Sequence, residues 1–406
     1  MVNMGELFAH PRIRDISMDL VPVDEKEHHY LLEVGDLLFA RQSLVLSGAG
    51  QCSIFLGNSS PTVFESHLIR CRLDARRSNS LFYFYFFRSP EGRRAIEAIV
   101  EQGAGASGIR GSDLVNVQVP NPSKQIQDEI AKILGVIDDR ITLLRETNAT
   151  LEAIAQALFK SWFVDFDPVR AKAEGLEPQA MDAPTAALFP DSFEESELGL
   201  VPKGWRLAAL ADAYEMNPSR KIKKGEVAPY LDMSSAPTSG HCSEAYIQRE
   251  MGSGAKFTNG DTLLARITPC LENGKSAFVD FLDDGQNGWG STEFLVLRPK
   301  APLPEYHGYL LARHTAFREF AVQSMSGTSG RQRIQNDVLG RFVLALPTES
   351  VANAFSDLVM PIQKSITANH QQAQTLTQLR DTLLPRLISG QLRLPEAEAQ
   401  LEAGSA

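Results

Sequence analysis

The sequence contains an internal repeat, and this repeat constrains the fold more than any other feature. The segment GDLLFAR at residues 35–41 recurs as GDTLLAR at residues 260–266, so the second copy lies 225 residues after the first. A single offset that continues into the following helical segments indicates one duplicated unit and not two unrelated domains. Further matched pairs are Gly105 and Gly330, Ile109 and Ile334, Leu114 and Leu339, Pro122 and Pro347, Ile137 and Ile362, Ile141 and Ile366, and Leu158 and Leu383.

Each copy is predicted to consist of a mixed globule followed by a long helical segment. The globules cover residues 1–123 and 205–349, and the helical segments cover residues 124–164 and 350–390. The counterpart of Trp205 would precede Met1. We therefore expect the first globule to be shorter at its N-terminus than the second.

The helical segments carry the seam of a coiled coil. In the first segment, apolar or small residues, with one asparagine among them, recur in steps of four and three, the spacing that two supercoiled helices require. Pro122 excludes an earlier start and Pro168 ends the helix, which leaves a rod of roughly 60 Å. The seam positions are 130, 134, 137, 141, 144, 148, 151, 154 and 158.

Each seam contains one asparagine. An antiparallel helix pair with a twofold axis near residue 146 would set Asn148 against Asn369. A buried asparagine pair fixes the register of a coiled coil at some cost in stability. The alternative is that these are two unrelated, exposed asparagines.

The globules have the pattern of mixed α/β domains. Short apolar runs at residues 262–267 and 277–282 predict strands. Residues 81–100 could be strand or helix by periodicity, but their counterpart at residues 309–322 has a helical pattern, so we predict helices at both places. The predicted fold class is α+β, with two domains of mixed α/β structure separated by an antiparallel pair of long coiled-coil helices and related by an internal pseudo-twofold repeat.

The charge is distributed unevenly along the chain. There are 40 Lys and Arg against 50 Asp and Glu, a formal net charge of −10. Nine acidic and two basic residues fall within residues 165–200, so we predict an acidic surface linker over residues 165–204 and a flexible tail over residues 391–406. The globules are near neutral, and their Arg and Lys residues are clustered. Such clusters can bind phosphates, or they can simply be solvated surface.

The motifs of catalysis and metal binding are missing or incomplete. GAGASG at residues 103–108 fits a dinucleotide-binding pattern but follows a predicted helix and not a strand, and NGKS at residues 273–276 lacks the first glycine of a P-loop. The four cysteines form no CxxC pair. The longest apolar run, residues 81–87, is far shorter than the ~20 residues that span a bilayer. We expect a cytoplasmic protein with no catalytic residues, no bound metal and no membrane association.

Four stretches resemble a known family. QIQDEIAKILGVIDDRITLLRETNATLEAIAQALFKSWFVDFDPVRAKAEG at residues 125–175 resembles the central segment of the DNA-specificity subunit of type I restriction-modification systems. LGLVPKGWRLAAL at residues 198–210, GDTLLARITPCLENGK at residues 260–275 and LRDTLLPRLISGQL at residues 379–392 are similar to further parts of that family.

The resemblance implies a non-catalytic subunit that reads double-stranded DNA. The two globules would be target-recognition domains, each of which would read one half of a split, asymmetric target, and the helices would act as a ruler between them. The partners implied are two modification (methyltransferase) subunits and restriction (translocase-nuclease) subunits. S-adenosylmethionine, ATP and Mg would be bound by those partners and not by this chain.

Base recognition requires hydrogen-bonding side chains on exposed loops. The candidates lie after the GDxLxAR segments, in the glycine-rich loops and in one basic run. They are Arg41, Gln42, Ser43, Ser107, Arg110, Arg220, Lys221, Lys223, Arg266, Thr268, Asn273, Lys275, Ser329, Arg331, Gln332 and Arg333. The alternative function is a coiled-coil scaffolding or adaptor protein that recognises protein or glycan.

Overall fold

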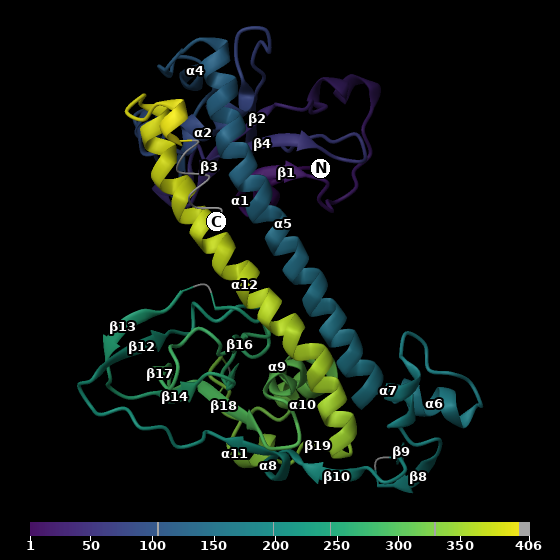
Figure 1. The fold of residues 1–406 in the computed structure, drawn as a ribbon. Helices are drawn as coiled ribbons and strands as arrows, with labels where there is room; N and C mark the ends of the chain where they lie inside the picture. The colour runs from purple at the N-terminus through teal and green to yellow at the C-terminus, as the bar shows by residue number, and fades with distance from the viewer. Residues whose placement is uncertain (104, 198, 244, 329, 398–406) are drawn as a thin grey trace. The chain divides into compact units, whose positions relative to one another are not determined.

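The computed structural model describes residues 1–103, 105–197, 199–243, 245–328 and 330–397. The chain forms two compact units, and each is described by itself. The first unit combines Met1–Leu143 with the chain from Ala373 onward, and the second unit is Leu144–Gln372. Each unit contains a globule with β-sheets and a part of each of two long helices (Figure 1).

A four-stranded sheet in the order β1-β4-β2-β5 forms the centre of the first globule. All four side chains of β2 are buried, since this strand lies between two others and is apolar on both faces. α1 (Met4–Ala9) contacts β2, and α2 (Ser80–Arg88) contacts β4. The strands are β1 (Arg12–Arg14), β2 (Leu37–Ala40), β4 (Cys52–Gly57) and β5 (Leu68–Cys71).

The aromatic run predicted as a helix is confirmed as α2, followed by α3 (Pro90–Glu97). Ser89 separates the two helices and caps the second, because its hydroxyl accepts a hydrogen bond from the backbone N–H of Gly92 at 3.2 Å. The ring centroids of Phe39 in β2 and Phe87 in α2 are 5.0 Å apart, in an edge-to-face arrangement. The helix therefore packs its aromatic side chains on the sheet.

Smaller elements complete the first globule. A second sheet has the order β3-β7-β6. Its strands are β3 (Gln42–Ser43), β6 (Glu101–Gln102) and β7 (Ser107–Gly108), and the other elements are η1 (Glu25–Tyr30), η2 (Leu46–Gly48) and α4 (Gly111–Leu114).

The second unit contains two four-stranded sheets, in the orders β11-β18-β15-β16 and β13-β12-β17-β14. A separate antiparallel pair joins β10 to β19. The strands are β10 (Arg206–Ala209), β11 (Tyr214–Met216), β12 (Val227–Leu231), β13 (Ile247–Glu250), β14 (Ala255–Thr258), β15 (Thr262–Ala265), β16 (Ser276–Phe278), β17 (Asn287–Gly290), β18 (Phe294–Pro299) and β19 (Val343–Leu346). The helices are α8 (Leu210–Ala213), α9 (Glu305–Arg313), α10 (Thr315–Gln323) and α11 (Asn336–Leu339).

The structure repeats with the offset found in the sequence. β15 and α11 begin 225 residues after β2 and α4, and α9 has the bounds of α2 moved by the same number. The long helices α5 (Lys124–Phe163) and α12 (Glu349–Ile388) match in the same way, and each has 40 residues. The predicted strand at residues 277–282 is shorter, because it ends with β16 at Phe278.

Within each unit, α5 and α12 contact one another. In the second unit the Asn148 and Asn369 side chains are hydrogen bonded, and Phe163 lies against Phe355, so residue numbers rise along one helix as they fall along the other. In the first unit Arg380 binds Asp138 at 2.7 Å. The predicted α+β fold class, with mixed globules and an antiparallel pair of long helices, is confirmed.

The predicted seam holds through Leu144 and then changes. Ile154, which we expected in the seam, is 45% exposed, and Ala155 is fully buried in its place. A straight α-helix has 3.6 residues per turn, so it drifts away from a strict 3.5-residue pattern. The aromatic residues Phe159, Trp162 and Phe163 are buried in the core of the second globule.

The acidic segment at residues 165–204 differs from the linker that we predicted. It folds into α6 (Asp167–Ala173), α7 (Ala183–Ala187) and the hairpin of β8 (Phe193–Ser196) and β9 (Gly199–Pro202). Val169 and Phe189 are buried in the core of the second globule, because the segment has apolar side chains between its carboxylates. Of the predicted tail, residues 398–406 lie outside the described residues, whereas Leu392 and Ala397 are buried.

Candidate nucleic-acid interface

The first globule brings two predicted segments together. β3 pairs with β7, so that Gln42 lies opposite Gly108 and Ser43 lies opposite Ser107. The backbone N–H of Ile109 donates to the carbonyl oxygen of Arg41 at 2.9 Å. The loop after the GDLLFAR strand and the glycine-rich loop therefore form one surface.

This surface is hollowed and charged. A depression of about 370 Å³ is bordered by Arg41, Gln42 and Arg110, together with residues of the β6–β7 turn. Arg41 and Arg110 are exposed, whereas the Ser107 side chain is buried and not offered to solvent. Arg110 donates from Nη2 to Oε2 of Glu101 at 2.6 Å, which places a carboxylate in the depression that the sequence did not reveal.

The second globule has the same backbone arrangement at the equivalent place. The backbone N–H of Ile334 donates to the carbonyl oxygen of Arg266 at 3.0 Å, which is the counterpart of the Ile109–Arg41 bond. Thr268 and Gln332 are joined by a backbone hydrogen bond of 3.0 Å and by a bond of 3.1 Å from the Gln332 N–H to the Thr268 hydroxyl. Four predicted residues, Arg266, Thr268, Gln332 and Arg333, therefore meet here.

The arginines of this second surface already have partners. Arg333 makes a two-pronged ion pair with Glu293, with distances of 2.7 and 2.8 Å, and its hydrogen bonds lower the pKa of the Glu293 carboxyl. Arg266 donates from Nη2 to Oε1 of Gln335 at 3.1 Å. Glu293 was not among the predicted residues, because its pairing with Arg333 requires two segments 40 residues apart in the sequence to meet.

Two predicted DNA-binding residues are held within the protein. Arg220 pairs with the fully buried carboxylate of Asp261 at 2.9 Å, and Lys275 donates to the backbone oxygens of Met233 and Ser234 at 2.7 and 3.2 Å. Their charged groups have these contacts because the loops they belong to fold back on the globule. Lys221, Lys223, Asn273 and Arg331 are exposed, and Ser329 lies outside the described residues.

Asp36 and Asp261 occupy the same place in the two units. Each carboxylate accepts a hydrogen bond at 2.8 Å from the backbone N–H three residues earlier, as expected for a turn before a strand. Each also pairs with an arginine of the neighbouring strand or its end, Arg72 directly after β5 in the first unit and Arg298 in β18 in the second. These matched pairs anchor the strand that leads to each candidate surface.

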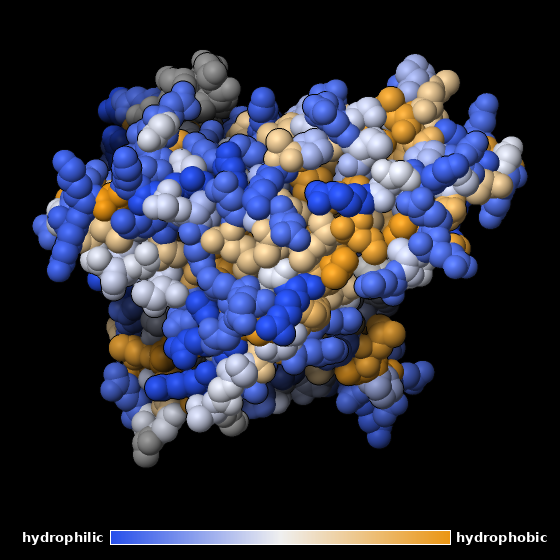
Figure 2. Space-filling model, turned by 90° about the horizontal axis from the view of Figure 1, so that it is seen from below, coloured by the Kyte–Doolittle hydropathy of each residue, from blue (hydrophilic) through white to orange (hydrophobic). Residues whose placement is uncertain are grey.

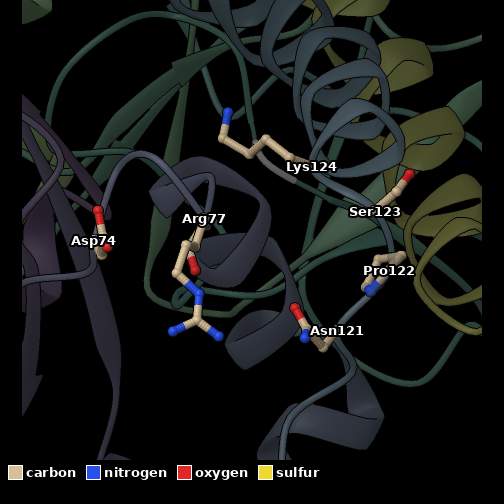
Figure 3. Close-up of a pocket in the computed structure, with 7 residues that line it drawn as sticks. Asp74, Arg77, Asn121, Pro122, Ser123 and Lys124 are labelled. Atoms are coloured by element: carbon tan, nitrogen blue, oxygen red, sulfur yellow. The ribbon is translucent and has the colours of Figure 1, made fainter.

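A second depression in the first unit lies between a loop and the start of α5. It measures about 550 Å³ and is bordered by Asp74, Arg77 and Ser78 on one side and by residues 121–124 on the other (Figure 3). Lys124 binds Asp128 and is therefore partly neutralised. We predicted no site here, although Arg77 belongs to one of the basic clusters.

A buried polar cluster in the second unit was also missed. His241 contacts the Tyr306 hydroxyl at 2.9 Å and the Asp280 carboxylate at 3.1 Å. Gln363 of α12 donates to the same carboxylate at 2.9 Å, so this cluster ties the helix to the globule. Burial disfavours the charged form of Asp280, but the hydrogen bonds from His241 and its neighbours hold the pKa of that carboxyl below its usual value.

The surface shown in Figure 2 is largely polar, and the described residues include neither a group of three metal-binding side chains nor a helix that could span a membrane. The face seen in Figure 2 is covered mostly by hydrophilic side chains, with hydrophobic groups showing between them. Within the described part of the chain, His, Cys, Asp and Glu form no group of three that could hold a metal ion. No described helix has both the length and the apolarity that a membrane span requires.

Comparison with known proteins gives consistent results. A family model described as the type I restriction modification DNA specificity domain matches residues 23–153. The type I restriction enzyme MjaIX specificity subunit of Methanocaldococcus jannaschii is 24% identical over 335 residues, covering 78% of this chain and 70% of the relative. The type I restriction enzyme HindI specificity subunit of Haemophilus influenzae is 26% identical over 371 residues, covering 77% of each protein.

A solved structure agrees with the fold. The S subunit of a type I restriction-modification system from M. genitalium superimposes with a TM-score of 0.52 at 15% identity, covering 93% of this chain and 88% of that one. At this level of identity the likeness concerns the fold alone. Residues 23–153 thus match a type I restriction modification DNA specificity domain, and the resemblance of the chain to the specificity subunits of type I restriction-modification systems is confirmed.

Proposed function

We propose that this chain is the DNA-recognition subunit of a type I restriction-modification complex and reads a split, asymmetric target. One observation carries the proposal: both units build the same surface from the loop after the GDxLxAR strand and the glycine-rich loop, but with different side chains. Arg41, Gln42 and Arg110 border the first surface, whereas Thr268, Gln332 and Arg333 lie at the second. Two similar surfaces with different hydrogen-bonding groups suit two different half-sites.

The helices support the role of a ruler. α5 and α12 have 40 residues each, and a helix of that length is roughly 60 Å long. Half-sites that are read from one face of B-DNA lie about 34–36 Å apart, or a multiple of that distance. We propose that the length of these helices sets the spacing between the half-sites.

The partner subunits supply the chemistry in this proposal. Lys132, Arg140 and Arg145 lie exposed on α5 and offer a docking face for the modification subunits. S-adenosylmethionine would be bound by two such subunits, and ATP and Mg by restriction subunits, in the cytoplasm. The chain itself would transfer no group and cut no bond, and would select only where its partners act.

Methylome sequencing tests the proposal. Strains with and without this gene are compared, with the partner genes expressed in both. We expect a bipartite adenine-methylation motif that disappears with the gene and returns on complementation. If no motif disappears, the chain is not a specificity subunit. Binding of the purified chain to protein or glycan without any preference among DNA sequences would favour an adaptor instead.

A further inference from the structure

Two arginines at equivalent positions hold two equivalent loops. Arg93 in α3 donates from Nη2 to the carbonyl oxygens of Ser47 at 3.1 Å and Ala49 at 3.4 Å. Arg318 in α10 donates from Nη2 to the carbonyl oxygen of Glu272 at 3.1 Å. Both the arginines and the primary acceptors, Ser47 and Glu272, are related by the 225-residue offset. The duplication has therefore kept the donor, the acceptor and the hydrogen bond between them.

Burial supports a structural purpose for both arginines. Desolvation lowers the pKa of Arg93 and of Arg318, so each guanidinium is withdrawn from water in order to reach a backbone oxygen. In the second unit, Arg313 donates to the carbonyl oxygen of Gly274 at 2.8 Å and adds a further bond to the same loop. A side chain at Gly274 would meet the guanidinium, because a Cβ there would lie 2.7 Å from Nη2 of Arg318.

The two loops that are held in this way differ in the side chains they expose. The first, residues 44–50, has the sequence LVLSGAG, and its first two side chains are 88% and 60% exposed. The second, residues 269–275, has the sequence PCLENGK and exposes Glu272 and Asn273, while Leu271 is fully buried. Each loop begins directly after residues of a candidate surface. Residues 44–50 follow Gln42 and Ser43 of β3, and residues 269–275 follow Thr268.

We propose that Arg93 and Arg318 are positioning residues for two specificity-determining loops, and that Leu44 and Val45 contact thymine methyl groups in one half-site. The proposal rests on the function proposed above. Apolar side chains recognise the thymine methyl group in the major groove, whereas asparagine pairs with adenine and a carboxylate accepts from cytosine. The loop at residues 269–275 thus contributes Asn273 and Glu272 to the other half-site. Equivalent arginines therefore hold one loop that offers apolar side chains to the DNA and one that offers polar side chains.

The test uses the chain assembled with its modification subunits and a library of duplexes with randomised targets. Methylated products are sequenced to give the base preference at every position of both half-sites. Leu44→Ser and Val45→Thr remove apolar groups from an exposed loop, so folding is unaffected. We expect each substitution to lower the preference for thymine about fourfold for every apolar methyl group that it removes from the DNA, in one half-site only.

The arginine variants test the positioning role. Arg93→Ala is expected to relax several positions of the half-site that Leu44→Ser affects, Arg93→Lys is expected to restore part of the preference, and Arg318→Ala is expected to relax the other half-site. Arg94→Ala and Glu319→Ala are matched controls, because both residues are exposed neighbours on the same helices. Thermal unfolding of each variant separates a changed loop from a lost fold.

The outcomes are distinguishable. If the wild-type complex shows no base preference, the proposed function fails. If the wild-type complex reads a bipartite target and the loop variants leave every preference unchanged, only this inference fails. It fails equally if Leu44→Ser weakens methylation of all sequences alike, or if Arg93→Ala and Arg318→Ala relax the same half-site.

Discussion

The two globules have the same backbone arrangement but differ in how their charged side chains are paired and buried. At the first surface, Arg110 and Glu101 form an ion pair whose side chains are both more than half exposed. At the second, Arg333 is fixed by Glu293, and further back Arg220 and Arg298 both reach the buried carboxylate of Asp261. Duplication therefore preserved the strand, the loop, the turn and the pairing of the turn aspartate with an arginine, while the other ion pairs around them diverged. We expect the second unit to have the more rigid DNA-recognition surface, and its stability to be the more sensitive to the loss of a single charge.

Asp261→Ala is the strongest test of this difference. The carboxylate is fully buried and faces two arginines and a backbone N–H, so its removal takes the ion-pair partner from the largely buried Arg220 and leaves Arg298 with Glu305 alone as a charged partner. We expect a loss of about 3–5 kcal/mol in the free energy of unfolding. Asp36→Ala should cost less, because its partner Arg72 is 38% exposed and can reach water. Chemical denaturation of both variants measures the two losses.

Asp337→Ala is the matched control for this prediction. Its ion pair with Arg341 is 74% and 72% exposed, and a pair of that kind contributes about 0–1 kcal/mol. Equal losses for Asp261→Ala and Asp36→Ala would contradict the view that the second unit depends more on buried charge.

Acidification should separate the units further. Burial lowers the pKa of His307 to about 3, so the folded protein keeps this imidazole neutral where the unfolded chain would bind a proton. Stability from this group is complete above the unfolded pKa near 6.5 and is lost as the pH falls from there towards 3, by up to about 5 kcal/mol. Asp280 contributes in the same direction at lower pH, because its depressed pKa stabilises the fold above the unfolded pKa of Asp.

Tryptophan fluorescence measures this effect in one unit. The chain has three tryptophans, Trp162, Trp205 and Trp289, and all lie in the second unit. We expect their acid unfolding transition to move to lower pH in His307→Phe, whereas His10→Gln, at an exposed position of the first unit, leaves it unchanged. An unchanged transition in His307→Phe would show that other groups govern the acid stability of this unit.

The helix contacts differ between the units as well. Arg380 and Asp138 form an ion pair in the first unit, whereas the Nδ2 of Asn369 donates to Oδ1 of Asn148 at 2.9 Å in the second. The contact expected from the seam is therefore present, and its role in fixing register stays a prediction. Asn148→Ala leaves Asn369 unpaired and should cost about 1–2 kcal/mol, as measured by thermal unfolding. The double variant Asn148→Leu/Asn369→Leu should recover that loss and leave the register less strictly specified.

The sequence was sufficient to predict the structural elements that depend on a local residue pattern or on the internal repeat. Prolines and the 225-residue offset predicted where both long helices lie. Periodicity alone did not decide whether the segment of α2 is a strand or a helix, and the offset to α9 decided for a helix. The ion pairs could not be predicted in this way. Arg220 and Asp261 are 41 residues apart, and only the folded backbone shows that a residue expected to bind DNA is held by a buried carboxylate. The acidic segment at residues 165–204 was predicted to be a surface linker because of its charge. It is folded instead, because a few apolar side chains between the carboxylates are buried in the core.

The smallest expected effect concerns charges that remain free on the surface. Lys223 is exposed and follows Arg220, which is held within the protein, so the comparison of these two neighbours separates a phosphate contact from a structural one. Lys223→Ala should weaken binding of the assembled complex to all DNA sequences alike and lower the slope of log affinity against log salt concentration by about 1. Arg220→Ala should instead reduce stability and leave the slope unchanged in the fraction that stays folded. Affinities measured over a range of salt concentrations decide between these results, and a change of base preference in Lys223→Ala would show that this lysine reads a base and not a phosphate.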